Sequence, residues 1–420
     1  MKKFFRYFGY TLLCIIAIVG ILWVGFKIYI ALNSADDPLM DDSDLIPKIT
    51  VVADEDNGWF ELKEAEKAMY YPKEQSELIG EMASGEDWNA DFAQELVERN
   101  EEAYKHFYVA SQKPYIVSPK LNKLAVENYN FSFEPESQLH IRSLARLSII
   151  RARYLVTEGG SALPVKIVQD LHKVGASLQE SPNPDMITYL VGLSLKNIAY
   201  EFIEDQMNHF NREERIALQN MLSIIPGGSD SLERVMQSEY VMFKNSIIMT
   251  DALGRDEFAR ERNIPLEQIS KTNYYFKPNQ SINSFGEGMK RMIEQPVSLC
   301  GDIHLVNEMA EELNAPGSIG YILTENAAGL LLTDVLNANV WKGLAYKKCS
   351  EDFIIIALNV RLATEGYKSG YGAYAATLNE LQENEYLVKD VPEKLHDWDI
   401  VYDSEVGQLI EPDDENFKSL

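Results

Sequence analysis

The chain has 420 residues, 46% of them apolar, so it is long enough and apolar enough to bury a sizeable core. Its formal net charge is −26. Residues 1–32 contain four basic residues and no acidic ones, so the rest of the chain carries −30. A field of this sign repels phosphate backbones and anionic lipid surfaces. The composition therefore argues against nucleic-acid binding and against docking on acidic membranes.

The first predicted element is an apolar helix at residues 9–32. Residues 10–26 carry no charge, and the IYIAL sequence after Lys27 completes the roughly 20 apolar residues that a bilayer requires, if Lys27 snorkels to the interface. Three basic residues precede this segment within residues 1–8, and five aspartates follow it within residues 36–44. This distribution of charges predicts a single-pass signal-anchor in the cytoplasmic (inner) membrane. Residues 1–8 would form a cytoplasmic tip, and the bulk of the chain would lie outside the cytoplasm.

Two other interpretations of this segment stay open. It could be a cleaved signal peptide, although the apolar stretch is long and no convincing A-x-A site follows it. The second interpretation rests on residues 9–13, which read GYTLL behind a basic start and resemble the G-F-T-L processing site of type IV pilin precursors. That family places a glutamate where this chain has Cys14.

After the apolar helix, residues 33–58 are rich in Asp, Pro, Ser and Asn and predict a tether. Apolar residues at helical spacing then predict a helical extracytoplasmic domain over residues 59–369. The clearest elements are helices at 137–157 and 162–179, because the intervening Glu-Gly-Gly-Ser sequence ends one helix and caps the next. We expect a mainly α fold, an irregular array of helices with αα-hairpins. Further helices are expected at 61–84, 87–111, 186–207, from 211 to a break at 226–229, and at 230–252, 285–294, 300–313, 318–347 and 350–369, with a less regular segment at 254–284.

The end of the chain differs from the helical part. Two strand candidates, 400–402 and 408–410, flank an Asp-Ser-Glu turn and predict a small β-hairpin. Residues 370–411 are too apolar for a disordered tail, yet too few to fold alone, so we expect them to cover the apolar face of the helix at 353–363. Residues 412–420 form an acidic tail.

Several stretches resemble a group of uncharacterised bacterial proteins that are membrane-anchored or exported and have a helical outer domain. The resemblance covers most of residues 50–410 and implies kinship and fold, but no activity. It is carried by the turn and packing motifs at residues 54–62, 144–160, 185–199, 276–285 and 315–326, and by the tail.

Residues 357–392 are also similar to the pseudopilin segment Y-x-x-x-x-G-x-Y-P-x-x-L-x-x-L, which continues to a proline and an Asp-Pro-aromatic-Gly turn. In this chain Ala375 stands in place of the proline after Tyr374, and the turn appears as Asp397-Trp398-Asp399. The resemblance implies a small packing module in which four side chains cover the last helix: Tyr374, Leu378, Leu381 and Leu387.

Four arginines gather in the predicted helix at residues 137–157, within a strongly acidic chain. Arg142, Arg146 and Arg153 lie on roughly one face of this helix, and Arg151 lies between them in sequence. A functional interpretation is an anion-binding patch for a carboxylate or phosphate ligand. The alternative is that these arginines form internal salt bridges to the abundant acidic residues.

No metal or cofactor site is predicted. His304 and Glu308 have the spacing of a shared metal site, with Asp302 nearby, but no third strong ligand accompanies them. The acidic residues 397–405 are dense enough to suggest calcium, yet they lack the order and the glycine of an EF-hand. The chain contains no nucleophile elbow, P-loop or dinucleotide fingerprint.

Three cysteines are present and none forms a CxxC pair, which excludes a zinc ribbon or a thioredoxin-type site. Cys300 and Cys349 would lie in an oxidising compartment under the predicted topology and could form a disulfide. Such a bridge would close a loop of roughly 50 residues and contribute on the order of 4 kcal/mol. The alternative is a pair of buried free thiols.

These features predict a membrane-tethered extracytoplasmic binding or scaffold protein, with a protein partner in the cell envelope and no nucleic acid. The alternative is a cell-envelope hydrolase with a site built from dispersed acidic and histidine residues. A deep cleft with convergent carboxylates would favour the hydrolase, whereas an aromatic-rich groove would favour binding.

The predicted topology can be tested with a reporter fused after Leu420. A reporter that functions only outside the cytoplasm should be active there, because the basic start of the chain stays inside. Activity of a cytoplasm-only reporter at the same position would show that the orientation is opposite to the predicted one.

Overall fold

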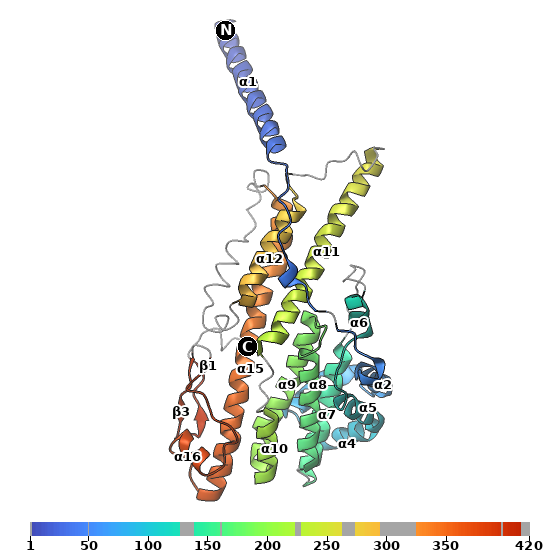
Figure 1. Cartoon of the computed structure of the whole chain (residues 1–420), viewed down its shortest axis with the longest axis vertical. Helices are drawn as coiled ribbons and strands as arrows, with labels where there is room; N and C mark the ends of the chain where they lie inside the picture. Colours follow the sequence, from blue (N-terminus) through green and yellow to red (C-terminus); the bar gives the residue numbers. More distant parts are fainter. Residues whose placement is uncertain are drawn as a thin grey trace. The chain divides into compact units, whose positions relative to one another are not determined.

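The computed structural model describes residues 2–48, 50–126, 138–159, 162–222, 228–262, 274–294, 325–395 and 398–412. In this part the chain is mainly helical, with one apolar N-terminal helix and small antiparallel hairpins near the C-terminus, which confirms the predicted fold class (Figure 1). It divides into two compact units. The first contains the described residues of 1–43, 243–288 and 307–340, and the second those of 44–242, 289–306 and 341–420.

The N-terminal helix of the first unit, α1, spans Lys2–Leu32. The stretch Ile15–Leu32 is long and apolar enough to cross a membrane. Its large apolar side chains are exposed, as Ile21 and Leu32 illustrate at 72% and 77%.

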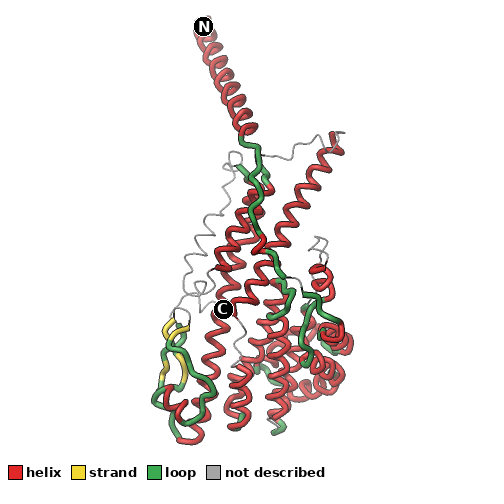
Figure 2. The backbone as a smooth tube through the Cα atoms, viewed as in Figure 1, coloured by secondary structure: helices red, strands yellow, loops and turns green. Residues whose placement is uncertain are grey.

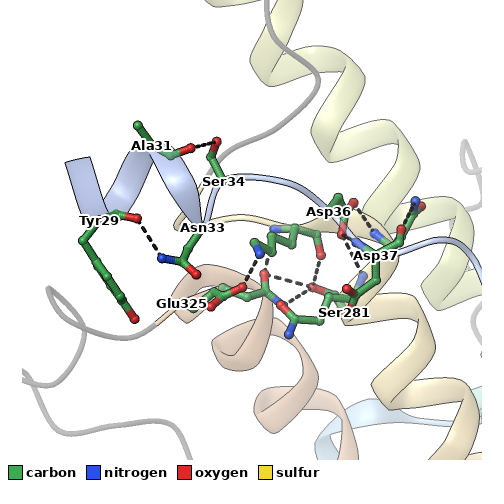
Figure 3. A network of polar contacts seen from close by, with 12 residues as sticks. Tyr29, Ala31, Asn33, Ser34, Asp36, Asp37, Ser281 and Glu325 are labelled. Carbon is green, nitrogen blue, oxygen red and sulfur yellow. Dashed lines mark hydrogen bonds and ion pairs between the residues drawn. The ribbon is translucent and has the colours of Figure 1, made fainter. Parts of the chain in front are cut away.

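Directly after α1 the chain is bonded to helix α12 (Pro278–Glu294) (Figure 3). The Asp36 carboxylate accepts hydrogen bonds from the backbone N–H groups of Asn279, at 2.8 Å, and Gln280, at 3.1 Å. It therefore caps the positive end of α12. The Asn283 side chain adds bonds to the backbone of residues 38 and 40. The first part of the predicted tether is thus a folded junction.

A buried amide organises the other side of this junction. The Asn326 Oδ1 accepts a hydrogen bond from the backbone N–H of Lys277 at 2.7 Å, and its Nδ2 donates to Ser281 at 3.0 Å (Figure 3). The Asn326 N–H donates to the carbonyl of Tyr274, whose ring meets that of Tyr29 from α1 edge to face at 5.8 Å. The end of α1 is therefore part of the packing of the first unit.

The second unit begins with short helices and then contains a group of longer ones. Figure 2 draws the helices of the described chain in red. The predicted helical hairpin is confirmed, because α7 and α8 end and begin where the Glu-Gly-Gly-Ser sequence places them. Up to residue 222, the α-helices of this unit are α2 Trp59–Ala68, α3 Ser76–Ser84, α4 Ala90–Arg99, α5 Glu101–Ser111, α6 Pro119–Val126, α7 Leu139–Thr157, α8 Ala162–Gln179, α9 Met186–Gln206 and α10 Arg212–Leu222.

Two predicted helices are wrong in extent, because one is split at a proline and the other at a buried asparagine side chain. The segment 61–84 divides into α2 and α3 around Pro72, which lacks the backbone donor that a helix needs. The segment 87–111 divides into α4 and α5 at Asn100. The buried Asn100 side chain donates to the Leu96 and Tyr70 carbonyls and accepts from the Tyr70 N–H, so it replaces helix bonds at this point.

Helices α8 and α9 cross at a pair of glycines. A Cβ atom added to Gly192 would lie 2.5 Å from the Gly175 carbonyl oxygen, and one added to Gly175 would lie 2.7 Å from the Gly192 carbonyl oxygen. No larger side chain fits at either position without moving a backbone. This close approach fixes the position of α9, which carries several residues of the candidate site.

Three long helices extend beyond their predicted bounds. The helix α11 spans Gly228–Arg262, and α12 begins at Pro278 instead of residue 285. The predicted break between 347 and 350 is wrong, since α15 runs without interruption over Ala327–Tyr371. The Lys-Lys-Cys-Ser sequence at the expected break contains no proline or glycine, and three of its four residues are buried. The helix predicted at 300–313 lies outside the described residues.

The tail packs on the second half of α15. After the short helix α16 (Leu378–Glu383), the predicted hairpin is confirmed as β3 (Tyr402–Asp403) with β4 (Gln408–Leu409). A second hairpin, β1 (Lys394–Leu395) with β2 (Trp398–Asp399), was not predicted. Two buried clusters join the tail to α15. One contains Ala363, Tyr367, Ala375, Leu381 and Leu387, and the other contains Phe353, Ile356, Val360 and Leu409.

This packing can be tested at Leu381, which is fully buried. The substitution Leu381→Ala should lower the free energy of unfolding by about 2–5 kcal/mol, since it leaves a cavity against α15. The exposed Val401→Ala is the matched control and should change it by less than about 0.5 kcal/mol. Thermal melting of the full chain in detergent measures both. Equal melting temperatures for the two variants would mean that the tail does not stabilise the domain.

Candidate functional site

A hollow of about 370 Å³ lies in the second unit, with walls from α3, α7, α9 and α15. Arg142 and Arg146 reach it from adjacent turns of α7, and Lys347 reaches it from α15. The Arg146 guanidinium lies over Gly80, where an added Cβ would be 3.8 Å from its Cζ atom. Three cationic side chains from two helices therefore share one concave surface.

These three cations are unpaired within the described part of the chain. Among the described residues, the side chains of Arg142, Arg146 and Lys347 form no ion pair and no hydrogen bond, although the chain carries a net charge of −26. Arginine presents its donors in a fork that matches carboxylate and phosphate oxygens, and lysine adds a mobile point charge. The hollow is thus chemically suited to an anion.

Arg153 and Arg151, on the same helix, have internal partners. Arg153 is buried, donates from Nε to the Ala83 carbonyl at 3.0 Å and forms an ion pair with Asp205. Arg151 pairs with Glu101 at 3.3 Å. The predicted set of Arg142, Arg146 and Arg153 is therefore divided: two members line the hollow, while Arg153 ties α7 to α3 and α9.

Glu201 is the acidic residue that lines the hollow. It is exposed as a residue, yet the neighbouring atoms partly desolvate its carboxyl group and raise the pKa, while Arg153 and Arg142 act to lower it. It forms no ion pair among the described residues. With Glu201 ionised, the lining side chains carry a net charge of about +2.

A second hollow of about 250 Å³ adjoins the first and shares Asn197, Glu201 and Lys347 with it. Tyr200 and Ser350 also line this second hollow. Both side chains are buried, and their hydroxyls have no hydrogen-bond partner in the described structure. Such unsatisfied groups are uncommon in folded proteins and need an explanation.

A buried network of charges lies beside the second hollow. Lys196 of α9, 0% exposed, forms an ion pair with Glu351 of α15, 1% exposed. The Gln179 amide donates to the other Glu351 oxygen at 3.4 Å, and Lys348 pairs with Asp352 one turn apart. Burial lowers the pKa of Lys196, and the adjacent Glu351 carboxylate opposes that effect.

His172 of α8 is buried beside this network and has a ring centroid 5.9 Å from that of Tyr200. Burial and then the charge of Lys196 lower its pKa to about 3. The imidazole is therefore neutral at physiological pH, so it adds no charge to the network.

A third hollow, of about 400 Å³, is lined by aromatic side chains of α5 and by residues of α7 and α8. Its cations are paired: Arg151 lies over the Tyr104 ring and bonds Glu101, while Lys166 lies 5.3 Å from the Tyr108 ring and bonds Asp170. This hollow is an aromatic groove with satisfied charges, so it offers apolar contact rather than charge recognition.

Among the described residues, no group of three His, Cys, Asp or Glu residues could hold a metal. Asp302, His304, Glu308 and Asp397 lie outside the described residues. Asp399 pairs with Lys394, Asp403 accepts a hydrogen bond from the Glu405 N–H, and Glu405 is in the hairpin turn.

The predicted disulfide is only partly visible. Cys349 is buried and is disulfide-bonded. Cys300 lies outside the described residues, so the pairing of Cys300 with Cys349 stays a prediction.

Comparison with known protein families, with curated proteins and with solved structures finds no match for the chain. The resemblances drawn from its motifs therefore stay predictions, and the function must be inferred from the site itself.

Sequence reasoning found two of the three cations but missed Lys347, Glu201 and the Lys196–Glu351 pair. A signal for Lys196 was present, because it is the one basic residue in the largely apolar stretch MITYLVGLSLKNIAYEF. A lysine inside such a stretch is buried with a partner when the helix is enclosed on all sides.

The buried pair gives a direct stability test. The substitution Lys196→Met should destabilise the protein by about 3–5 kcal/mol, because it leaves the Glu351 carboxylate buried without its partner. The double variant Lys196→Met/Glu351→Leu should regain much of that loss. As a control, Lys67→Met removes an exposed ion pair with Glu64 and should change stability by less than about 1 kcal/mol. A Lys196→Met variant that melts like the Lys67→Met control would show that the pair is solvated.

Proposed function

We propose that this chain is a membrane-tethered extracytoplasmic binding protein whose hollow between α3, α7, α9 and α15 captures a small anion. The observation that carries the proposal is that Arg142, Arg146 and Lys347 share one hollow of a strongly acidic protein and have no ion-pair partner among the described residues. Acidic residues outnumber basic ones 65 to 39, so unpaired cations at one concave site mark the site as special.

The junction after α1 supports an uncleaved anchor. Tyr29, inside the apolar helix, packs against Tyr274, and Asp36 caps α12 only a few residues after the helix ends. Cleavage within residues 29–36 would remove contacts of the folded unit. The extracytoplasmic orientation rests on the charge bias of the sequence, and the protein partner in the envelope is also part of the proposal.

The described histidines favour binding over hydrolysis. His106 pairs with Glu61 at 2.7 Å, His140 lies 3.6 Å from Glu66, and His172 is buried and neutral. Neither these three nor His209, the fourth described histidine, lines the basic hollow. A hydrolase would need a base and a nucleophile within hydrogen-bond reach of each other at one concave site, and the residues lining this hollow do not include such a pair.

The proposal can be tested by calorimetric titration of the full-length protein in detergent with inorganic phosphate and with succinate. The protein should bind at least one of them saturably, and binding should weaken as ionic strength rises. The substitution Arg146→Gln should reduce affinity about tenfold or more, since it removes a charge-assisted hydrogen bond. Glu201→Gln should increase affinity, because it removes the negative charge from the hollow.

Arg151→Gln is the matched control, because it makes the same charge change on the same helix but lies in the aromatic groove. It should leave the affinity unchanged. Equal losses of affinity in Arg146→Gln and Arg151→Gln would show that only the net charge of the protein matters. The absence of saturable binding for both probes would refute an anion site.

A further inference from the structure

The basic hollow is larger than a bare anion needs, and it opens into the second hollow. Asn197, Glu201 and Lys347 line both, so a ligand held at the arginines can extend past these residues without leaving the site. The two volumes are about 370 and 250 Å³, and ligand pockets in general fall in the range of about 300–1,000 Å³. The ligand should therefore have a charged head and a further body.

The charge of the first hollow defines the head. Arg142, Arg146 and Lys347 oppose the single carboxylate of Glu201, which leaves a net charge of about +2. A phosphate monoester carries about −1.5 to −2 at neutral pH and has three strong acceptor oxygens. Three cationic groups from two helices match three oxygens around one phosphorus atom better than they match a planar carboxylate.

The chemistry of the second hollow defines the body. Tyr200 and Ser350 have buried hydroxyls without partners there, and leaving such a group unsatisfied costs about 1–3 kcal/mol. Two of the three acids of this hollow are already paired, since Glu204 pairs with Arg361 and Glu351 pairs with Lys196. The third, Glu201, is balanced by the charge of Lys347 in the same hollow. The second hollow therefore offers hydrogen bonds rather than net charge, and a ligand body rich in hydroxyls would use them.

We infer that the site takes a phosphate monoester of a polyhydroxylated compound, with the phosphate between Arg142, Arg146 and Lys347 and the hydroxyl-bearing body in the hollow lined by Tyr200 and Ser350. This inference rests on the proposed function, because it assigns a ligand class to the same site. It adds a second set of contacts that a simple anion does not make, and this difference makes it separately testable.

The test compares inorganic phosphate with glucose 6-phosphate on the full-length protein. Glucose 6-phosphate should bind about tenfold tighter or more, because its hydroxyls add hydrogen bonds in the second hollow. Tyr200→Phe and Ser350→Ala should each weaken glucose 6-phosphate about five- to tenfold and leave inorganic phosphate unchanged. Arg146→Gln should weaken both ligands.

Tyr189→Phe is the matched control. Tyr189 lies on α9, as Tyr200 does, and its buried hydroxyl also has no hydrogen-bond partner in the described structure, but it lines neither hollow. This variant should bind both ligands like the unsubstituted protein. Thermal melting of each variant separates a loss of contact from a loss of fold, and Ser350→Ala provides a second probe where Tyr200→Phe unfolds.

The outcomes distinguish the two levels of the proposal. Equal affinity for the two ligands, or unchanged glucose 6-phosphate binding in both Tyr200→Phe and Ser350→Ala, overturns the ligand class but leaves the anion site in place. Binding of neither ligand overturns both. Sedimentation with phosphatidic acid vesicles tests whether the phosphate comes from a lipid. If the protein co-sediments with these vesicles and Arg146→Gln abolishes this, the ligand is a lipid headgroup and not a polyhydroxylated compound.

Discussion

The ion pair between Lys196 and Glu351 is the interaction on which the geometry of the candidate site depends. Both side chains are almost completely buried, so each charge has lost its hydration and is stabilised mainly by the other. The pair joins α9 to α15 at one register, because a shift by one residue along either helix would bury an unpaired charge. Lys347 lies one helical turn before Glu351, so the register that satisfies the pair also brings Lys347 to the hollow. The close approach of Gly175 and Gly192 likewise fixes the position of α9 against α8, because no larger side chain fits between the two backbones.

The arginines of α7 show how an acidic protein keeps a basic site. Arg151 and Arg153 are neutralised by Glu101 and Asp205, so they contribute to packing and not to the field of the hollow. Arg142 and Arg146 point to a surface where Glu201 is the acid that lines the wall. Distant acidic residues still oppose the approach of an anion, but salt screens them over about 8–10 Å. A contact in the hollow is closer than that distance, so local charge outweighs net charge once the ligand has arrived.

The sequence was sufficient where a local signal determines the structure. The α7–α8 hairpin follows from the Glu-Gly-Gly-Ser sequence that separates the two helical patterns, and the β3–β4 hairpin follows from two short apolar runs around an acidic turn. It was insufficient where a tertiary contact decides. The polar sequence Lys347–Ser350 was interpreted as a break, but residues 348–350 are buried and α15 continues through them. Arg153 has the same helical spacing as Arg142 and Arg146, and only the position of Ala83 and Asp205 shows that it serves the fold.

The folded junction after α1 joins the apolar helix to the first unit through specific contacts. A flexible linker of 26 residues would let its ends separate by about 28 Å on average, by the scaling for disordered chains. The hydrogen bonds of Asp36 and Asn283 instead leave only a few residues between the apolar helix and α12. Ordering this segment costs conformational entropy, which the cap on α12 and the contact between Tyr29 and Tyr274 help to offset. The first unit is therefore held at the end of α1 by specific contacts, and α1 is a structural part of that unit.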